Sequence, residues 1–275
     1  MRPPALFQYN ARDRRDVAEA LADLGQGFRL WRLWFELAYD DLRQRYRRTS
    51  FGALWMSISY LVFAVTIALI GSQMTGVELF PFMVYVAVGY LAWNFINASV
   101  TDGCTVFINT ENWISGMRLP FSLFVYQSIA REVIIFGYGA IIAVGIILFT
   151  GHSLTWTALA AFPALLLYLI NAVSSHLLFG VLVTRYRDIS QIIQTAMRVI
   201  FFLTPLIWTP SQAGGLREWL WWNPFTYFID VFRAPIVDGI IPWDSWMFCL
   251  IFSAVFGLIA FGLFAHFRRR IVFWF

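Results

Sequence analysis

The sequence contains no lysine, because all 20 of its basic residues are arginines. Without a side-chain amine, the chain can form no lysine Schiff base and lacks the lysine of a phosphate-binding P-loop. The motif G-x-x-x-x-G-K-[ST] is therefore absent, and we expect no nucleotide hydrolysis by P-loop chemistry in this chain. If the chain takes part in a process driven by ATP, another chain has to hydrolyse the ATP, and this chain is then not expected to be an enzyme by itself.

Cysteine and histidine are also scarce and scattered. Cys104 and Cys249 lie far apart in the sequence, which excludes a disulfide framework and a cysteine metal cluster. His152, His176 and His266 do not have the spacing of a zinc site. Neither H-E-x-x-H nor G-x-S-x-G occurs, which argues against a zinc protease or a hydrolase of those types. We predict that this chain binds no metal and no cofactor.

Charged residues are few, at 13% of the chain against about 25% in average soluble domains. Hydrophobic residues reach 60%, compared with about 45–50% on average. They lie in long uncharged windows, and about 20 apolar helical residues cross the roughly 30 Å hydrocarbon core of a bilayer. The windows predict an all-α integral membrane protein with six transmembrane helices, at about 51–74, 80–100, 122–149, 156–183, 190–209 and 245–266.

The arginines are distributed unevenly along this pattern. If both termini are cytoplasmic, sixteen arginines lie on cytoplasmic segments and only Arg217 and Arg233 lie on outer segments. Cytoplasmic flanks retain positive charge, so the bias predicts cytoplasmic N and C termini in a multi-pass membrane protein. The first residues lack a central apolar run, so no secretory signal is expected. Residues 1–48 would form a cytoplasmic region and residues 49–275 the transmembrane domain.

An apolar helical face repeats at spacings of three and four residues before the first span. The repeat predicts an amphipathic helix at about 28–42 that lies in the membrane plane, with its arginines on the polar side. A soluble helix packed on a partner protein is the alternative. The apolar face consists of Phe28, Trp31, Phe35, Ala38 and Leu42.

The last outer loop, Pro210 to Asp244, is nearly as apolar as the spans. Its internal prolines exclude one continuous helix. We predict two short re-entrant helices, broken near Asn223-Pro224, because irregular backbone at membrane depth survives only when it is buried in protein or lines a cavity. The loop would then form a closed cover at the outer end of the protein. The residues that mark the loop are Trp222, Asn223, Pro224, Tyr227 and Arg233.

Arg131 and Glu132 fall inside the predicted third span. Adjacent residues on a helix point about 100° apart and do not face each other. They lie either near the cytoplasmic interface with a partner on a neighbouring helix, or inside a translocation path. Arg198 in the predicted fifth span leaves the same choice open. His176 lies among other polar residues of the fourth span, which favours hydrogen bonding between helices over a proton relay.

Five segments of the sequence carry a resemblance to a known family when they are taken in order. They resemble the transmembrane subunit of ABC-2-type exporters, in the polysaccharide branch that exports O-antigen, capsule or teichoic acid polymers. The resemblance covers about residues 30–275. The charged third span and the absence of lysine depart from it, so it does not identify the polymer. The segments are Asp41 to Trp55, Asn112 to Pro120, Arg187 to Ile189, Leu203 to Trp208, and Asn223 to Tyr227 with Arg233.

The resemblance implies a homodimer with a channel between the two copies. It also implies two ATP-binding cassette subunits, which carry the ATP and Mg²⁺ and bind on the cytoplasmic side. The loop from Asp102 to Arg118 would be the coupling helix that docks on the ATPase, and an interfacial loop without a partner is the alternative. The residues expected at this contact are Phe107, Asn109, Thr110, Glu111, Asn112 and Trp113.

The implied cargo is a lipid-linked glycan; membrane lipid is expected as a neighbour and nucleic acid is not. Aromatic residues make up 19% of the chain, and Tyr and Trp offer flat faces on which sugar rings stack. Enrichment of Trp and Tyr at membrane interfaces is the alternative explanation. The candidate channel residues are Tyr85, Tyr90, Trp93, Phe95, Arg131 and Glu132.

Three rival functions stay open at this point. An ABC-2 permease for a drug or a small lipid would share the fold and the coupling helix. An intramembrane glycosyl or acyl transferase would need a convergent acid or histidine site, which the sequence does not reveal. A passive channel would conduct without an ATPase.

Overall fold

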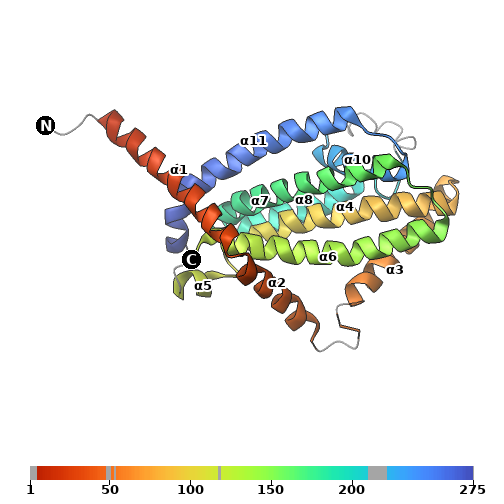
Figure 1. The fold of residues 1–275 in the computed structure, drawn as a ribbon, viewed down its shortest axis with the longest axis horizontal. Coiled ribbons are helices and arrows are strands. Elements are labelled where there is room, and N and C mark those ends of the chain that lie inside the picture. Colours follow the sequence, from red (N-terminus) through yellow and green to blue (C-terminus); the bar gives the residue numbers. More distant parts are fainter. Residues whose placement is uncertain (1–4, 48–50, 53, 117–118, 210–221, 275) are drawn as a thin grey trace.

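The structure of the chain is a computed structural model, and it describes residues 5–47, 51–52, 54–116, 119–209 and 222–274. The described part of the chain is helical and contains no strand. Both ends of the chain lie at one end of a long helix bundle, which we call the terminal end; α10 lies toward the opposite, loop end (Figure 1). The elements are α1 (Ala5–Arg29), α2 (Trp31–Tyr46), α3 (Leu54–Thr75), α4 (Leu79–Thr105), α5 (Glu111–Gly116), α6 (Phe121–Thr150), η1 (Trp156–Ala160), α7 (Ala161–Arg185), α8 (Asp188–Leu203), α10 (Pro224–Val237), α11 (Trp243–Phe267) and η4 (Arg268–Phe273).

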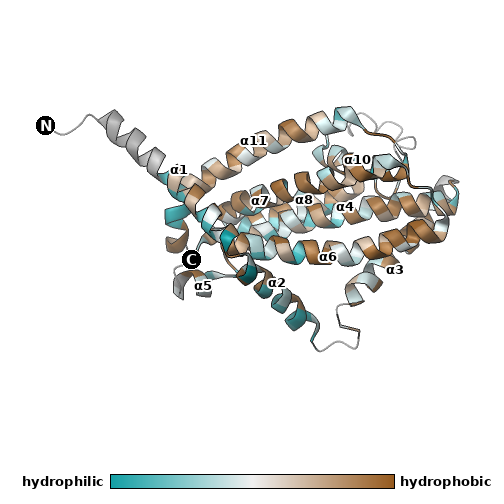
Figure 2. Ribbon diagram, viewed as in Figure 1, coloured by the Kyte–Doolittle hydropathy of each residue, from teal (hydrophilic) through white to brown (hydrophobic). Residues whose placement is uncertain are grey.

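Five segments of the described chain are long and apolar enough to cross a bilayer. A helix pairs its backbone groups within itself, as the water-free interior of a bilayer demands. Figure 2 shows these helices largely in brown and white, while strongly hydrophilic residues gather in α1 and α2. The predicted all-helical membrane architecture is therefore confirmed. The segments are Leu54–Gln73, Leu79–Thr105, Phe121–Thr150, Trp156–Arg185 and Trp243–Phe273.

α8 occupies the place of the predicted fifth span, but it ends six residues before the predicted boundary at 209. Its 16 residues extend about 24 Å, less than the roughly 30 Å hydrocarbon core. The helix stops because Thr204 precedes Pro205, and a proline ring disfavours helical geometry in the residue before it. Thr204 is accordingly extended, with φ −94° and ψ 138°. The count of six complete spans stays a prediction.

α4 is the centre of the bundle, because α3, α6, α7, α8 and α10 all pack against it. α4 and α7 approach closely at Gly103, where an added Cβ would lie 3.1 Å from the His176 Cα and 3.2 Å from its backbone nitrogen. A side chain at this position would push the two helices apart. The contact brings the polar residues of α7 beside those of α4 and α6.

The N-terminal region forms two helices rather than one. α1 and α2 meet at Leu30, whose φ of −83° and ψ of 33° interrupt the helical path. α1 crosses the terminal end and extends beyond the bundle, while α2 packs against α6 (Figure 1). Ala38 and Leu42 of α2 are buried, whereas Trp31 and Phe35 are exposed. The predicted apolar face is thus divided between protein and surface, and its placement in a membrane plane stays a prediction.

The described part of the predicted outer loop is dominated by α10, which packs against α4, α7 and α11. α10 begins at Pro224, whose missing N–H is not needed in a first turn. Asn223 caps the helix, its Oδ1 accepting a hydrogen bond from the Phe225 amide at 3.0 Å. α10 takes the place of the second predicted re-entrant helix. The first falls on 210–221, outside the described residues, and re-entry itself stays a prediction.

Replacing Gly103 with alanine is expected to lower the stability by about 1–3 kcal/mol, because the new methyl group meets backbone atoms of α7. Gly145→Ala is the matched control: nothing lies within 4 Å of its added Cβ, and alanine favours a helix by about 0.5–1 kcal/mol. Thermal unfolding of the purified full-length variants compares the two. Equal melting temperatures would contradict the close packing of α4 on α7.

Candidate functional site

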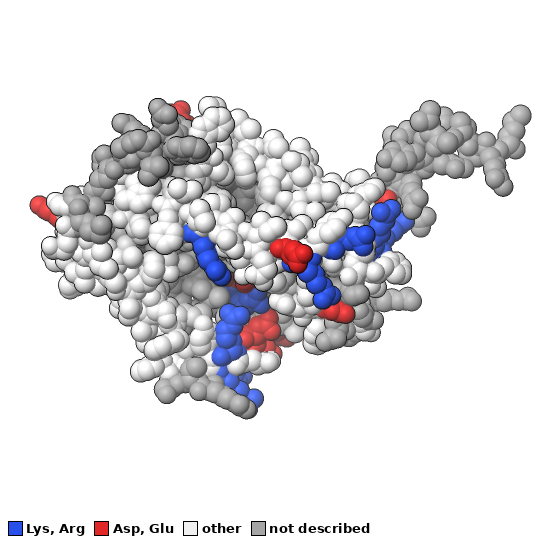
Figure 3. All heavy atoms as spheres, turned by 180° about the vertical axis from the view of Figure 1, so that it is seen from behind, with Lys and Arg blue, Asp and Glu red and all other residues white. Residues whose placement is uncertain are grey.

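Charged side chains gather toward the terminal end. Figure 3 shows the molecule from behind, with blue and red residues clustered on the side of the N-terminal helices and the rest of the visible face nearly white. Burying an ionised group in an apolar bundle is costly unless it is paired. We therefore expect the functional polar contacts of the bundle to lie where these charged side chains meet.

Asp23 of α1 holds the first turn of α6. Its buried carboxylate accepts hydrogen bonds from the backbone amides of Phe121 at 3.2 Å and Ser122 at 2.9 Å. First-turn amides have no partner within their own helix, and the helix dipole favours a negative group beside them. Arg268 of η4 binds the same carboxylate, with Nη2 at 2.9 Å from Oδ2. One side chain thus joins α1, α6 and the C-terminal segment.

α1 passes the start of α6 at Gly27. An added Cβ at this position would overlap Ser122 Oγ and lie 3.0 Å from the Leu123 backbone nitrogen. A second ion pair joins α1 to η4, with Arg269 Nη2 at 2.6 Å from Glu19 Oε1. Because Arg269 is exposed, we expect this second pair to add little stability.

A polar cavity of about 380 Å³ lies between α2, α4, α5 and α6. Arg131 of α6 lies on its wall and binds carboxylates of two other helices. Its Nη2 is 3.0 Å from Asp102 Oδ2, and its Nη1 is 3.4 Å from Asp41 Oδ2. Gln127 Nε2 also donates a hydrogen bond to Asp41, at 2.8 Å. Arg131 therefore has partners on neighbouring helices, as one of its two sequence-based alternatives requires.

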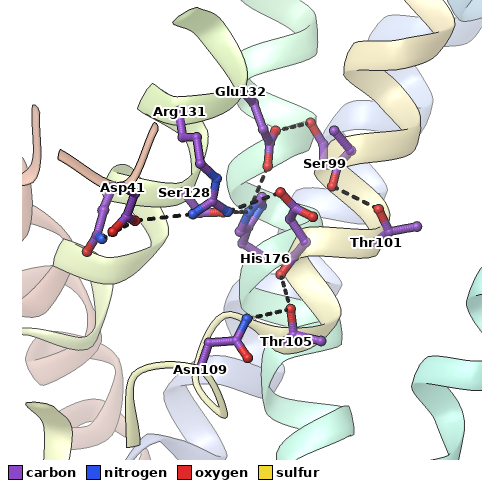
Figure 4. Close-up of polar contacts among 12 residues, drawn as sticks. Asp41, Ser99, Thr101, Thr105, Asn109, Ser128, Arg131, Glu132 and His176 are labelled. Carbon is purple, nitrogen blue, oxygen red and sulfur yellow. Dashed lines mark hydrogen bonds and ion pairs between the residues drawn. The ribbon is translucent and has the colours of Figure 1, made fainter. Parts of the chain in front are cut away.

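Glu132 and Arg131 point in different directions, as their adjacent positions on a helix require (Figure 4). Glu132 is buried, and Ser99 Oγ lies 2.6 Å from its Oε2. Its Oε1 lies 3.2 Å from Nε2 of His176, which is also buried. The same Nε2 is 3.0 Å from Ser128 Oγ, which accepts a hydrogen bond from Arg131 at 3.0 Å. We call these five residues, from α4, α6 and α7, the buried polar cluster.

One side of the predicted coupling segment packs against the helix bundle, and the other side is exposed. Phe107 is buried, and its ring lies where a Cβ on Gly180 of α7 would be 2.9 Å away. It therefore fixes the segment to the bundle instead of facing a partner. Trp113 of α5 is 47% exposed. Among the remaining predicted contact residues, Asn109 is exposed, Thr110 and Glu111 are half-buried, and the Asn112 side chain lies outside the described residues.

Arg233 joins α10 to α4 at the loop end. It is buried, its Nη1 donates to the Pro205 carbonyl at 2.6 Å, and its guanidinium lies 3.9 Å from the centre of the Tyr85 ring. The Tyr85 hydroxyl donates toward the carbonyls of Pro205 and Trp208, at 3.0 and 3.2 Å. Partial burial raises the pKa of Asp238, an effect that nearby Arg233 opposes. These contacts tie α10 to the chain that follows α8.

The other candidate channel aromatics pack against other aromatic rings of the same chain. Tyr90 stacks on Phe63, with ring centres 4.0 Å apart. Trp93 and Phe95 are buried in the bundle. Their position beside a channel stays a prediction. Of the remaining outer-loop residues, Trp222 is exposed and Tyr227 stacks on Phe248, with ring centres 4.1 Å apart.

Sequence reasoning did not single out four acidic and basic partners that the structure brings into these sites. Their only sequence signal is charge next to a predicted helix end, which does not identify a partner far away in the chain. Among the described residues, no group of three or more His, Cys, Asp or Glu side chains is placed to hold a metal ion. The four residues are Asp23, Asp41, Asp102 and Arg268.

Comparison with known proteins adds a family and two relatives. A family model described as ABC-2 type transporter matches residues 32–237. The O-antigen export system permease protein RfbA of Klebsiella pneumoniae is 20% identical over 245 residues, which cover 88% of this chain and 94% of the relative. The protein of the same name from Myxococcus xanthus is 21% identical over 217 residues, which cover 76% of this chain and 82% of the relative. The family match contains α3 to α10 and the whole buried polar cluster.

Replacing Asp23 with alanine is expected to cost about 3 kcal/mol, because it frees two first-turn amides and leaves Arg268 without its buried partner. Asp16→Ala is the control, since its partner Arg269 is exposed and such pairs contribute about 0–1 kcal/mol. The measurement is the thermal unfolding of both full-length variants in lipid or detergent. A Asp23→Ala protein as stable as the Asp16→Ala protein would refute the capping role.

Proposed function

The chain belongs to the ABC-2 type transporter family, and we propose that it is the membrane-spanning permease subunit of an ATP-driven exporter of a lipid-linked polysaccharide. Both relatives are named as O-antigen export permeases, and each is similar over most of its length. These names support an O-antigen-like polymer as the cargo, and a capsule-like polymer is the second cargo that we propose. The chain would act as a homodimer in the bacterial inner membrane, with the terminal end in the cytoplasm.

The ATP would be hydrolysed elsewhere. This chain has no lysine and so no P-loop, and the family implies ATP-binding partner subunits. Two such subunits, with their ATP and Mg²⁺, would dock on the terminal ends of the two copies. The observation that carries this proposal is the exposed Trp113 on a short helix whose preceding turn is anchored by buried Phe107.

The terminal end is built to pass a displacement into the bundle. α5 comes directly before α6 in the chain, and Asp23 fixes the first turn of α6 to α1 and η4. Arg131 ties α6 to α2 and α4. A force on α5 or α2 would therefore reach α6 and the central helix α4 together. In the proposed exporter, this movement would open or close the seam between the two copies.

Two rival functions differ from this one in what they require. An ABC-2 permease for a drug or small lipid would use the same coupling surface, and only the cargo would change. An intramembrane transferase would use an acid–histidine pair such as Glu132 and His176, but both side chains are fully buried. Turnover of a glycosyl or acyl donor by the purified chain alone would favour the transferase.

Tagged chain purified from its native membrane is expected to retain an ATP-hydrolysing subunit in a complex that holds two copies of each chain. The result follows because a chain without a P-loop cannot energise transport alone. Native mass spectrometry of the complex gives the stoichiometry. Recovery of the chain with no ATPase, under conditions in which the complex of a related exporter survives, would defeat the exporter proposal.

Replacing Trp113 with alanine is expected to reduce ATP-dependent glycan export about tenfold or more and to leave the melting temperature unchanged. Truncating a buried tryptophan at an interface typically costs about 2 kcal/mol or more of binding, whereas Trp113 is exposed within this chain. Glu111→Ala is expected to act in the same direction. Export and ATP hydrolysis are measured on the full complex in lipid vesicles.

Trp156→Ala is the matched control, because Trp156 is 89% exposed and belongs to η1, which packs against α10. α10 lies toward the loop end, far from α5 along the bundle (Figure 1). Its export rate should equal that of the unmodified complex. An unchanged export rate in Trp113→Ala would remove the coupling assignment. Export of a drug or short lipid in place of the glycan would keep the coupling but overturn the proposed cargo.

A further inference from the structure

The carboxyl group of Glu132 and the imidazole of His176 are fully buried against each other in the membrane domain. Ionisable groups at such depth are rare because an unpaired charge there costs several kcal/mol, and they commonly mark functional sites. The family-level function proposed above does not use this pair. Its protonation state can be read from the hydrogen-bond geometry.

The tautomer of His176 is fixed on one side of the ring. Nδ1 lies 2.8 Å from the carbonyl oxygen of Ala172, which can only accept a hydrogen bond. Nδ1 therefore carries a hydrogen. Nε2 faces Ser128 Oγ at 3.0 Å and Glu132 Oε1 at 3.2 Å. The protonation of Nε2 must then be compatible with Glu132.

One proton has to lie between the two residues. Without it, the lone pair of Nε2 would face an ionised carboxylate oxygen at 3.2 Å, and both groups would repel in a medium that screens charge poorly. With it, either Nε2–H donates to the carboxylate, or the carboxylic acid donates to Nε2. Oε1 has no hydrogen-bond partner among the described residues other than this contact, so the proton also satisfies a buried acceptor.

Ser99 fits both forms of Glu132. Its Oγ is 2.6 Å from Glu132 Oε2 and 2.8 Å from the carbonyl oxygen of Phe95. When Glu132 is ionised, the single hydroxyl hydrogen of Ser99 is donated to the carboxylate. When the acid proton lies on Oε1 and is donated to Nε2, Oε2 is the carbonyl oxygen of the acid and still accepts the hydroxyl hydrogen of Ser99. The change of charge on Glu132 therefore needs no movement of Ser99.

The pair lies between two cavities. Ser128, which contacts Nε2, lines the polar cavity of about 380 Å³ that opens among α2, α4, α5 and α6. Glu132 lines a second cavity, of about 340 Å³, between α3, α4 and α6. Nε2 is therefore one hydroxyl group away from the aqueous side on which the termini lie.

We propose that Glu132 and His176 form a proton-binding site that exchanges with the aqueous cavity at the terminal end through Ser128. In the release step, Nε2–H passes its proton to Ser128 Oγ, and the original hydroxyl proton of Ser128 passes to water in the cavity. Uptake follows the reverse order. Release leaves a carboxylate facing a lone pair and so weakens the contact between α6 and α7, whereas uptake restores it.

The remaining charged groups around the pair come from three helices. Arg131 of α6, which binds Ser128, is held by Asp41 of α2 and Asp102 of α4. The second cavity adds the phenols of Tyr46, Tyr60 and Tyr90. Arg131 keeps its charge throughout, so the shared proton is the variable charge at the centre of the buried polar cluster.

The test observes His176 alone, because the other two histidines of the chain are replaced. The full-length chain with His152→Asn and His266→Asn is labelled with ¹⁵N-histidine, placed in lipid nanodiscs and followed by NMR. The Nε2 hydrogen is expected to exchange with water about tenfold or more faster than the Nδ1 hydrogen, because Ser128 links Nε2 to the polar cavity whereas Nδ1 donates to the Ala172 carbonyl. In Glu132→Gln the Nε2 signal should shift, because the carboxyl partner is gone. An Nε2 hydrogen that exchanges no faster than the Nδ1 hydrogen, or an Nε2 signal that is the same without Glu132, would overturn the proposal.

A second variant tests the path and does not depend on the folding of Glu132→Gln. Ser128→Ala is expected to slow the exchange of the Nε2 proton with water about tenfold or more. Ser175→Ala, at a buried serine next to His176 in the sequence, is the matched control and should leave the exchange rate unchanged. Equal exchange rates in the two variants would show that the proton does not pass through Ser128.

Discussion

An ionised side chain inside an apolar helix bundle needs a partner from another helix, and this requirement organises the terminal end of the structure. α6 satisfies this requirement for a partner at two positions along its length. Its first turn receives the Asp23 carboxylate, which Arg268 also binds. Two turns further on, Arg131 and Glu132 find partners on α2, α4 and α7. Removing one partner of a buried pair costs more than the pair contributes, so the buried Asp23 and Glu132–His176 contacts fix α6 against α1 and α7. The carboxylates of Asp41 and Asp102 are 41% and 39% exposed, so their pairs with Arg131 contribute less.

The same contacts distinguish the two ends of the molecule. At the terminal end, α5 exposes Trp113 and leads directly into α6. At the loop end, Arg233 holds α10 against α4 and the Pro205 carbonyl. α4 contacts helices involved at both ends. In the proposed exporter, α4 is therefore the element through which docking at one end would be felt at the other.

Much of this architecture could be predicted from the sequence, because hydrophobic windows and proline positions are local signals. They predict four spans closely, and also the start of α10 at Asn223-Pro224. They do not predict the end of α8, where Pro205 disfavours helical geometry in Thr204. The partners of the charged residues could not be predicted from the sequence. Asp23 and Arg268 are separated by 245 positions, and no spacing rule connects them. For Arg131 and Glu132 the sequence leaves two positions open, near the cytoplasmic interface or inside a translocation path. Only the packing of four helices shows where each side chain points.

The fixed start of α6 is the feature on which both coupling and the buried cluster depend, and amide hydrogen exchange at Phe121 and Ser122 measures it directly. Both amides donate to Asp23, so they should exchange about tenfold or more slowly than the Phe80 amide. Phe80 lies in the first turn of α4, which has no side-chain cap. The slow exchange should persist in the full-length chain in lipid and disappear in Asp23→Ala. Exchange at Phe121 and Ser122 as fast as at Phe80 would contradict a fixed start of α6.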